Sequence, residues 1–525
     1  MWPSVLLIAL AGAPLLGDAL RSAIVRISPN RHALRALALP LGAGLAFAAG
    51  WLLMTEADWQ IVVGGWSPVS LTGSPLALAS FPPAQGLLIA WIAAYSAHLL
   101  SNLPAGQRLH PSGYALFTIA LLLVAFASNL ITLLVGLGLV DLLTLHYYLL
   151  RRKQAEDADV ALPDLALRSL AVLALALVGT VHAANGGSLH LLIAQLPPSA
   201  APVLALAAAL RLGFAPFRLP ASAPAGFVPI AGVLSAFLML MHWPRFGITA
   251  LPSWFYALAI ISALLHLLLR DPLMPHRSVA AAGAHLAALS IDLDVPGAVA
   301  AAASAWLLGI MLVDPSTPGS AAPRWAGLAT RVLGAACLIG FPLSIGFIGQ
   351  AGLLTSWIGQ NTAGWLLATG WIAALAILAD ALIALVATSS GPLAAPLWRW
   401  WMNRLVLFIP VALFSIFPSL LGAERWDELL ARRALADVLF WLPAISLGVL
   451  LWQIRVRWPV GWSALRTYVA PVLGLDWLHT LLTGTMRRAS RPFQLVFTVL
   501  EGDGVLVWAV IITLVLILLA RAGGP

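Results

Sequence analysis

Long apolar segments recur along nearly the whole chain and constrain its fold more than any other feature. The hydrocarbon core of a bilayer needs about 20 apolar residues per helix, whereas a membrane-spanning strand takes about ten alternating residues. A window of about 19 residues predicts spans at 4–25, 33–54, 86–104, 112–128, 130–150, 165–184, 199–217, 227–244, 252–270, 277–293, 297–313, 331–357, 364–388, 403–422, 436–454 and 504–520. The sequence therefore predicts an all-α, polytopic integral membrane protein with about 14–16 transmembrane helices.

The composition excludes several other classes of protein. Charged residues are 9% of the 525 residues and hydrophobic residues are 61%, whereas a soluble protein carries roughly 25% charged residues. A soluble enzyme, a disordered protein and a nucleic-acid-binding module are thereby excluded. The sequence has no phosphate-binding glycine loop or metal-ligand spacing, and its one cysteine, Cys337, lies in an apolar span. We therefore expect no cofactor, no metal and no catalytic site within the chain.

The distribution of arginines predicts the orientation in the membrane. Loops on the cytoplasmic side of a membrane protein carry an excess of Lys and Arg. With the N-terminus outside, the arginines of 21–35, the run Arg151-Arg152-Lys153 and Arg270 all fall on the cytoplasmic side. We expect a bacterial-type cytoplasmic (inner) membrane protein with its N-terminus outside. Segment 56–85 is then an external loop containing a short extended or hairpin stretch.

Two predicted spans carry glycine and proline near their centres. In 199–217 these residues are Gly213 and Pro216, and in 331–357 they include Pro342 and Gly346. Broken helices at membrane depth occur where protein or a wet cavity surrounds them, and two of them suggest an inverted-repeat transporter. The predicted parts are N-terminal helices (1–128), a first repeat core (129–270), a second repeat core (271–422), and C-terminal helices (423–525) with an interfacial amphipathic segment at 455–495.

Ionisable side chains inside the spans are candidate functional positions, because a charge at membrane depth costs at least a few kcal/mol. They are Asp141, His146, Arg211, His242, His266, His285 and Asp380, with Arg218 just beyond Arg211. His146 and His266 lie near span ends and are expected to reach water. The acidic group at 156–164, which ends at Asp164, lies beside Arg151-Arg152-Lys153 and is interpreted as a solvated connector.

Several short motifs carry a family resemblance. Asn129–Leu137 reads Asn-Leu-Ile-Thr-Leu-Leu-Val-Gly-Leu, and Pro342 precedes Gly346-Phe347 by four residues. From about residue 60 to about residue 390 the chain resembles the antiporter-like membrane subunits of respiratory complex I, Mrp sodium/proton antiporters, membrane-bound hydrogenases and a two-component inorganic-carbon uptake system. The resemblance implies an inverted-repeat fold and a subunit of a multisubunit assembly. Its partners would be other membrane subunits, with redox subunits or one large soluble partner.

The resemblance also implies a proton relay. At the relay positions this sequence carries residues that differ from those of the family. The family's glutamate falls on Gly138, and its Lys-x-Pro-x-x-Pro-x-His motif falls on Arg211, Gly213, Pro216 and Arg218. The relay residue of the second half falls on Gln350. A family lysine has become His242, and His285 matches a family histidine. Gly138 and Gln350 cannot carry a relay proton and Arg211 stays protonated, which leaves His242 able to titrate among these four.

Asp141 could take over from the missing glutamate, because it lies three residues, or one helical turn, after Gly138. Three alternatives remain open: a static ion pair with Arg211, a role in a working ion path, or no contact with Arg211. Asp380 is expected to line an interior cavity, with its partner unknown.

Three functions follow from these features. The first is a structural or weakly conducting subunit of a complex-I-like or antiporter-like assembly, such as a redox-driven translocase. The second is an active subunit that moves protons, cations or proton-coupled inorganic carbon through Asp141, Arg211, Arg218, His242, His285 and Asp380. The third is a membrane enzyme, which is disfavoured because the loops lack a cluster of catalytic Asp, Glu and His residues.

Overall fold

The structure is a computed structural model of the whole chain. It describes residues 2–27, 44–45, 48–53, 59–63, 76–100, 111–150, 155–191, 195–215, 227–248, 251–269, 275–293, 295–313, 324–358, 362–387, 397–423, 434–458, 484 and 488. The predicted span 504–520, and the interfacial segment after residue 458 apart from Gly484 and Arg488, lie outside the described residues.

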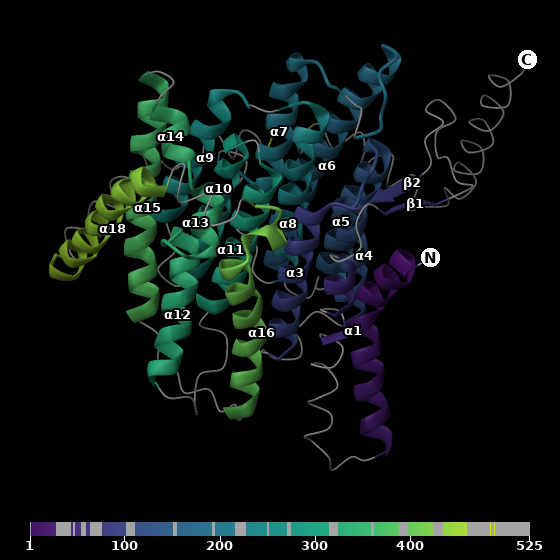
Figure 1. Cartoon of the computed structure of the whole chain (residues 1–525), viewed down its shortest axis with the longest axis horizontal. Coiled ribbons are helices and arrows are strands. Elements are labelled where there is room, and N and C mark those ends of the chain that lie inside the picture. The colour runs from purple at the N-terminus through teal and green to yellow at the C-terminus, as the bar shows by residue number, and fades with distance from the viewer. Residues whose placement is uncertain are drawn as a thin grey trace, which may run out of the picture. The chain divides into compact units, whose positions relative to one another are not determined.

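The described elements are almost all helices (Figure 1). The first part of the chain contains α1 (Trp2–Ile27), β1 (Gln60–Val63), β2 (Leu76–Ala79), α3 (Pro82–Leu100), α4 (Pro111–Ala125), α5 (Leu130–Leu150) and α6 (Ala155–Ala184). The middle contains η2 (Pro198–Ala200), α7 (Ala201–Leu212), α8 (Phe227–His242), η4 (Trp243–Phe246), α9 (Ser253–Leu268), α10 (Pro275–Ala287), η5 (Ala288–Leu293) and α11 (Pro296–Val313). The last part contains α12 (Arg324–Ile339), α13 (Ile345–Gln350), α14 (Leu353–Ile358), α15 (Thr362–Ala387), α16 (Leu397–Ile416), η6 (Pro418–Leu421) and α18 (Ala434–Arg457).

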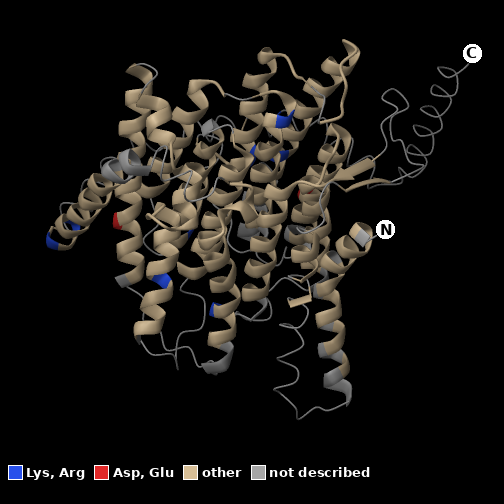
Figure 2. Ribbon diagram, in the orientation of Figure 1, with Lys and Arg blue, Asp and Glu red and all other residues tan. Residues whose placement is uncertain are grey.

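These elements confirm the predicted all-α membrane fold. Within the described residues, four helices are long and apolar enough by length and composition to cross a membrane: Leu130–Tyr147, Asp164–Ala184, Pro296–Val313 and Thr362–Val386. Shorter apolar helices fall at five of the other predicted spans, namely 112–128, 199–217, 252–270, 331–357 and 403–422. Figure 2 shows how few charged residues the described helices carry.

Helix α11 forms the centre of the packing. It contacts α3, α8, α10, α12, α13 and α16. Of its apolar span 89% is buried, compared with 28% for the span in α6. The reason is its run of small residues, Ala300–Ser304, which lets neighbouring backbones approach closely. Gly309 of α11 lies against the carbonyl of Gly334 in α12, and Gly349 of α13 lies against the backbone of Ala302.

The predicted hairpin in segment 56–85 is present. Strands β1 and β2 pair antiparallel in a register that runs from Gln60 opposite Ala79 to Val63 opposite Leu76. The hairpin is joined to the turn between α4 and α5, where the Ala79 N–H donates to the Phe126 carbonyl at 2.7 Å.

The structure breaks helices at both predicted places. Helix α7 ends at Leu212, and Gly213 follows with a φ of 71°. Between α12 and α13 the chain turns through Gly340 and Leu343, with φ of 76° and 71°. Glycine takes these left-handed angles without steric cost, whereas Leu343 is an uncommon case. The continuation of the first break, including Pro216, lies outside the described residues.

Candidate ion-pair site

Asp141 of α5 and Arg211 of α7 form a buried ion pair. Arg211 Nη1 donates to Asp141 Oδ2 at 2.9 Å, and Arg211 Nη2 donates to Asp141 Oδ1 at 3.0 Å. Arg211 is fully buried, and Asp141 is nearly so. This two-bond geometry is the strong form of an arginine–carboxylate contact. Of the three sequence alternatives, the one without contact is therefore wrong.

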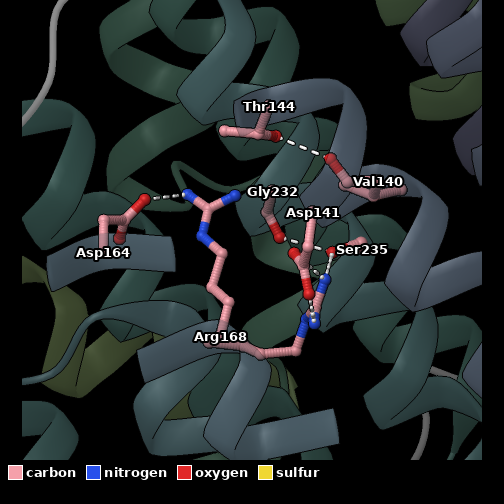
Figure 3. Close-up of polar contacts among 8 residues, drawn as sticks. Val140, Asp141, Thr144, Asp164, Arg168, Gly232 and Ser235 are labelled. Atoms are coloured by element: carbon pink, nitrogen blue, oxygen red, sulfur yellow. Dashed lines mark hydrogen bonds and ion pairs between the residues drawn. The ribbon is translucent and has the colours of Figure 1, made fainter. Parts of the chain in front are cut away.

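Helix α8 completes the surroundings of the pair (Figure 3). Arg211 Nη2 also donates to Ser235 Oγ at 2.8 Å, and the Ser235 hydroxyl donates to the Gly232 carbonyl at 2.6 Å. Both terminal nitrogens of Arg211 therefore have acceptors. Nothing in the sequence singles out Ser235, because a lone serine in an apolar span gives no pattern.

A second buried ion pair lies in α6. Arg168 Nη2 contacts Asp164 Oδ2 at 2.8 Å, and both side chains are buried (Figure 3). A Cβ on Gly232 would overlap the Arg168 guanidinium, so glycine makes room for it. The interpretation of Asp164 as part of a solvated connector was wrong. Its spacing of four residues from Arg168 was the signal that could have found this pair.

Gly138, unlike Asp141, does not face a close neighbour from another helix. Gly138 is half-buried, and a Cβ there would meet no atom within 4 Å. The chain thus places its carboxylate one turn further along α5, where it contacts α7.

His242 lies at the C-terminal end of α8. Its Nε2 lies 2.7 Å from the Val124 carbonyl at the end of α4, and its ring stacks on Phe81 with centroids 5.1 Å apart. The Arg245 guanidinium lies 4.5 Å from the centroid of the same Phe81 ring. Phe81 lies two residues after the end of β2, so these contacts tie His242 to the hairpin end of α8.

His285 of α10 contacts the end of α7. Its Nδ1 lies 3.0 Å from Ser262 Oγ, and its Nε2 lies 3.2 Å from the Leu212 carbonyl. His266 of α9 contacts the same group, with its ring centroid 4.9 Å from that of His285. The expectation that His266 reaches water was wrong because its side chain is fully buried. His146, in contrast, is exposed.

The second half has its own ion pair. Asp380 of α15 is buried, and its Oδ2 lies 3.1 Å from Arg455 Nη1 in the last turn of α18. Helix α18 therefore extends into the segment that was predicted to be interfacial from residue 455. Gln350 at the end of α13 is buried against Gly340 in the helix break. Arg218 lies outside the described residues.

Removing the partner of Asp380 is expected to destabilise the protein. Arg455→Met should cost about 1–3 kcal/mol, since Asp380 stays buried while Arg455 is partly exposed. Thermal unfolding of the detergent-solubilised protein measures this cost. The double variant Asp380→Asn/Arg455→Met should lose less stability than Arg455→Met alone. A loss of stability in the double variant equal to the sum of the losses in Asp380→Asn and Arg455→Met would show that the two charges do not interact.

The described residues contain no group of three or more His, Cys, Asp or Glu side chains placed to hold a metal ion.

Comparisons with known proteins identify the fold. No family model matches the sequence, and no curated protein matches it significantly. Among solved structures, a chain of the Mrp complex from Dietzia sp. DQ12-45-1b aligns with 99% of this chain at 18% identity and a TM-score of 0.72. This chain spans only 63% of that Mrp chain.

Respiratory complex I from Thermus thermophilus provides two further matches. In the structure with bound NADH, the matched chain covers 85% of this chain and 99% of its own length, at 19% identity and a TM-score of 0.58. In the structure with bound aureothin, the matched chain covers 80% of this chain and 98% of its own length, at 18% identity and a TM-score of 0.55. The chain is therefore an integral membrane protein with the fold of the antiporter-like membrane subunits of Mrp complexes and respiratory complex I.

Proposed function

We propose that the chain is a structural or weakly conducting membrane subunit of a multisubunit, antiporter-like assembly, in which a fixed ion pair replaces a titrating relay. The observation that carries this proposal is the buried, two-bond contact between Asp141 and Arg211. A relay works by changing the charge of its members in turn. Arginine keeps its proton at any working pH, so this pair holds a constant charge arrangement.

The other buried carboxylates support the same function. The structure describes the burial of three aspartates, Asp141, Asp164 and Asp380, and each lies within 3.1 Å of an arginine nitrogen. Each carboxylate thus has a counter-charge at contact distance, which fits a fixed structural arrangement of charges at membrane depth.

The assembly and its membrane belong to the same proposal. We infer that other membrane subunits cover part of the apolar surface, as in the multisubunit complexes whose chains share this fold. The N-terminus then faces outside and the membrane is a bacterial cytoplasmic membrane. We also infer that 129–270 and 271–422 form the two repeat cores, each with one helix break.

Proton flux measured in proteoliposomes tests the proposal. The protein is purified with its copurifying subunits, which mass spectrometry identifies, and is reconstituted with a pH-sensitive dye inside the vesicles. Flux driven by an imposed pH gradient is expected to stay close to that of protein-free vesicles. His242→Ala should leave the flux unchanged, because in this proposal His242 Nε2–H donates to the Val124 carbonyl and passes no proton along a path. Robust flux that His242→Ala abolishes would contradict the proposal.

A second candidate is an active translocating subunit that uses a rearranged path. The buried histidines at the α7 break favour it, because the rings of His266 and His285 lie 4.9 Å apart beside Ser262. The same vesicles distinguish the candidates. If protons pass through these two histidines, the proton flux should lie well above that of protein-free vesicles, and His266→Ala should abolish it.

A further inference from the structure

The end of α7 leaves backbone groups that the helix cannot satisfy. The Gly213 N–H bonds back to the carbonyls of Ala209 and Leu210, and the Phe214 N–H bonds to Ala209 at 3.0 Å. The Leu212 carbonyl and the Ala215 N–H lie beyond these bonds. Inside a membrane, water is not available to satisfy such groups, so side chains must do so.

Two side chains from other helices bind these backbone groups. The Ala215 N–H donates to Ser262 Oγ of α9 at 2.8 Å, and His285 Nε2 of α10 lies 3.2 Å from the Leu212 carbonyl. Ser262 Oγ and His285 Nδ1 lie 3.0 Å apart. Both residues are at most 1% exposed. The contacts thus start and end on the same helix break.

One arrangement of hydrogens satisfies every contact. A carbonyl accepts only, so His285 Nε2 carries the hydrogen that it shares with Leu212. In a neutral imidazole Nδ1 is then an acceptor, and it takes the Ser262 hydroxyl hydrogen. The Ser262 oxygen remains free to accept from the Ala215 N–H. Each donor has an acceptor, which is the condition for a stable buried polar network.

We infer that Ser262 and His285 form a clamp that closes the α7 break and positions Arg211 for its ion pair with Asp141. Arg211 directly precedes Leu212, whose carbonyl the clamp holds. The clamp also ties α7, in segment 129–270, to α10, in segment 271–422. Ser262 and His285 are thus positioning residues. The clamp does not depend on the proposed function, since it holds the backbone whether or not the subunit conducts.

Aromatic packing fixes the orientation of the imidazole. The Phe214 ring meets the His285 ring edge-on with centroids 4.9 Å apart, and Phe214 also packs on Phe255 at 5.3 Å. Phe214 belongs to the break itself. The break therefore packs on the His285 ring, while His285 in turn binds the Leu212 carbonyl of the break.

Hydrogen–deuterium exchange of the purified full-length protein, with its copurifying subunits, tests the clamp. In Ser262→Ala and His285→Ala, amides in peptides covering 209–215 are expected to exchange about tenfold faster, because a buried amide and carbonyl lose their partners. Peptides from α5, α11 and α15 should exchange at the wild-type rate. Ser262→Thr keeps the hydroxyl and should restore slow exchange.

Ser304→Ala is the matched control. Ser304 of α11 is as deeply buried as Ser262, and its hydroxyl has no hydrogen-bond partner within the described part of the chain. It should leave exchange at 209–215 unchanged. Unchanged exchange at 209–215 in Ser262→Ala and His285→Ala would overturn the clamp. Faster exchange spread evenly over all helices would also overturn it, since that marks general destabilisation.

A second readout tests the link to Arg211. His285→Ala should lower the melting temperature less in an Asp141→Leu/Arg211→Met background than in the wild type, because no ion pair is left to position. Equal shifts in both backgrounds would overturn the positioning role. Neither readout measures proton flux, so failure of the clamp and failure of the proposed function give separate results.

Discussion

Arg211→Met is expected to destabilise the folded protein by about 3–5 kcal/mol, the cost typical of removing one partner from a buried ion pair. Asp141 would keep its place beside α7 with its counter-charge gone. Ser235 would also lose the donor that binds its hydroxyl oxygen. The measurement is thermal or denaturant unfolding of the solubilised protein, together with the yield of monodisperse protein on size-exclusion chromatography.

The double variant Asp141→Leu/Arg211→Met separates loss of the pair from loss of one charge. It should recover most of the lost stability, because apolar residues of similar volume often replace buried ion pairs at little cost. Arg457→Met is the control, since Arg457 of α18 is exposed. A double variant as unstable as Arg211→Met would mean that the cavity, and not the uncompensated charge, sets the loss.

Gly346→Ala is expected to cost about 3 kcal/mol or more, at the upper end of the range for overpacking. A Cβ at this position would overlap the Cys337 carbonyl oxygen of α12. The obstacle is backbone, so no side-chain rotation relieves it, and α13 must move away from α12. Unfolding measurements and the exchange rate of amides in 337–350 report the change.

Gly138→Ala is the matched control for this substitution. Gly138 is also a helical glycine within a relay motif, but an added Cβ would meet no atom within 4 Å. It should be neutral or stabilise the protein by up to about 1 kcal/mol, because alanine favours helix. Similar losses in both variants would contradict the close approach of α12 and α13.

The sequence predicts most of the described helices and several of the charged positions. The spans, the hairpin in 56–85 and the two helix breaks came from hydropathy, glycine and proline. Asp141 and Arg211 were singled out because charges are rare at membrane depth. The partners were harder to find: Arg455, Ser262 and Arg168 were missed, and Asp164 was assigned to a solvated connector.

What the sequence by itself determined is therefore the class of fold and the absence of lysine from the predicted spans, since apolar length and residue chemistry are local properties. Only the tertiary structure decided which charges meet. Asp141 and Arg211 are 70 residues apart in the chain, and Asp380 and Arg455 belong to different helices. Such contacts depend on how helices rotate and pack, and hydropathy along a helix carries little information about that. His285 is a similar case. Its motif can be recognised in the local sequence, but its contact with the Leu212 carbonyl at the α7 break depends on how the helices pack.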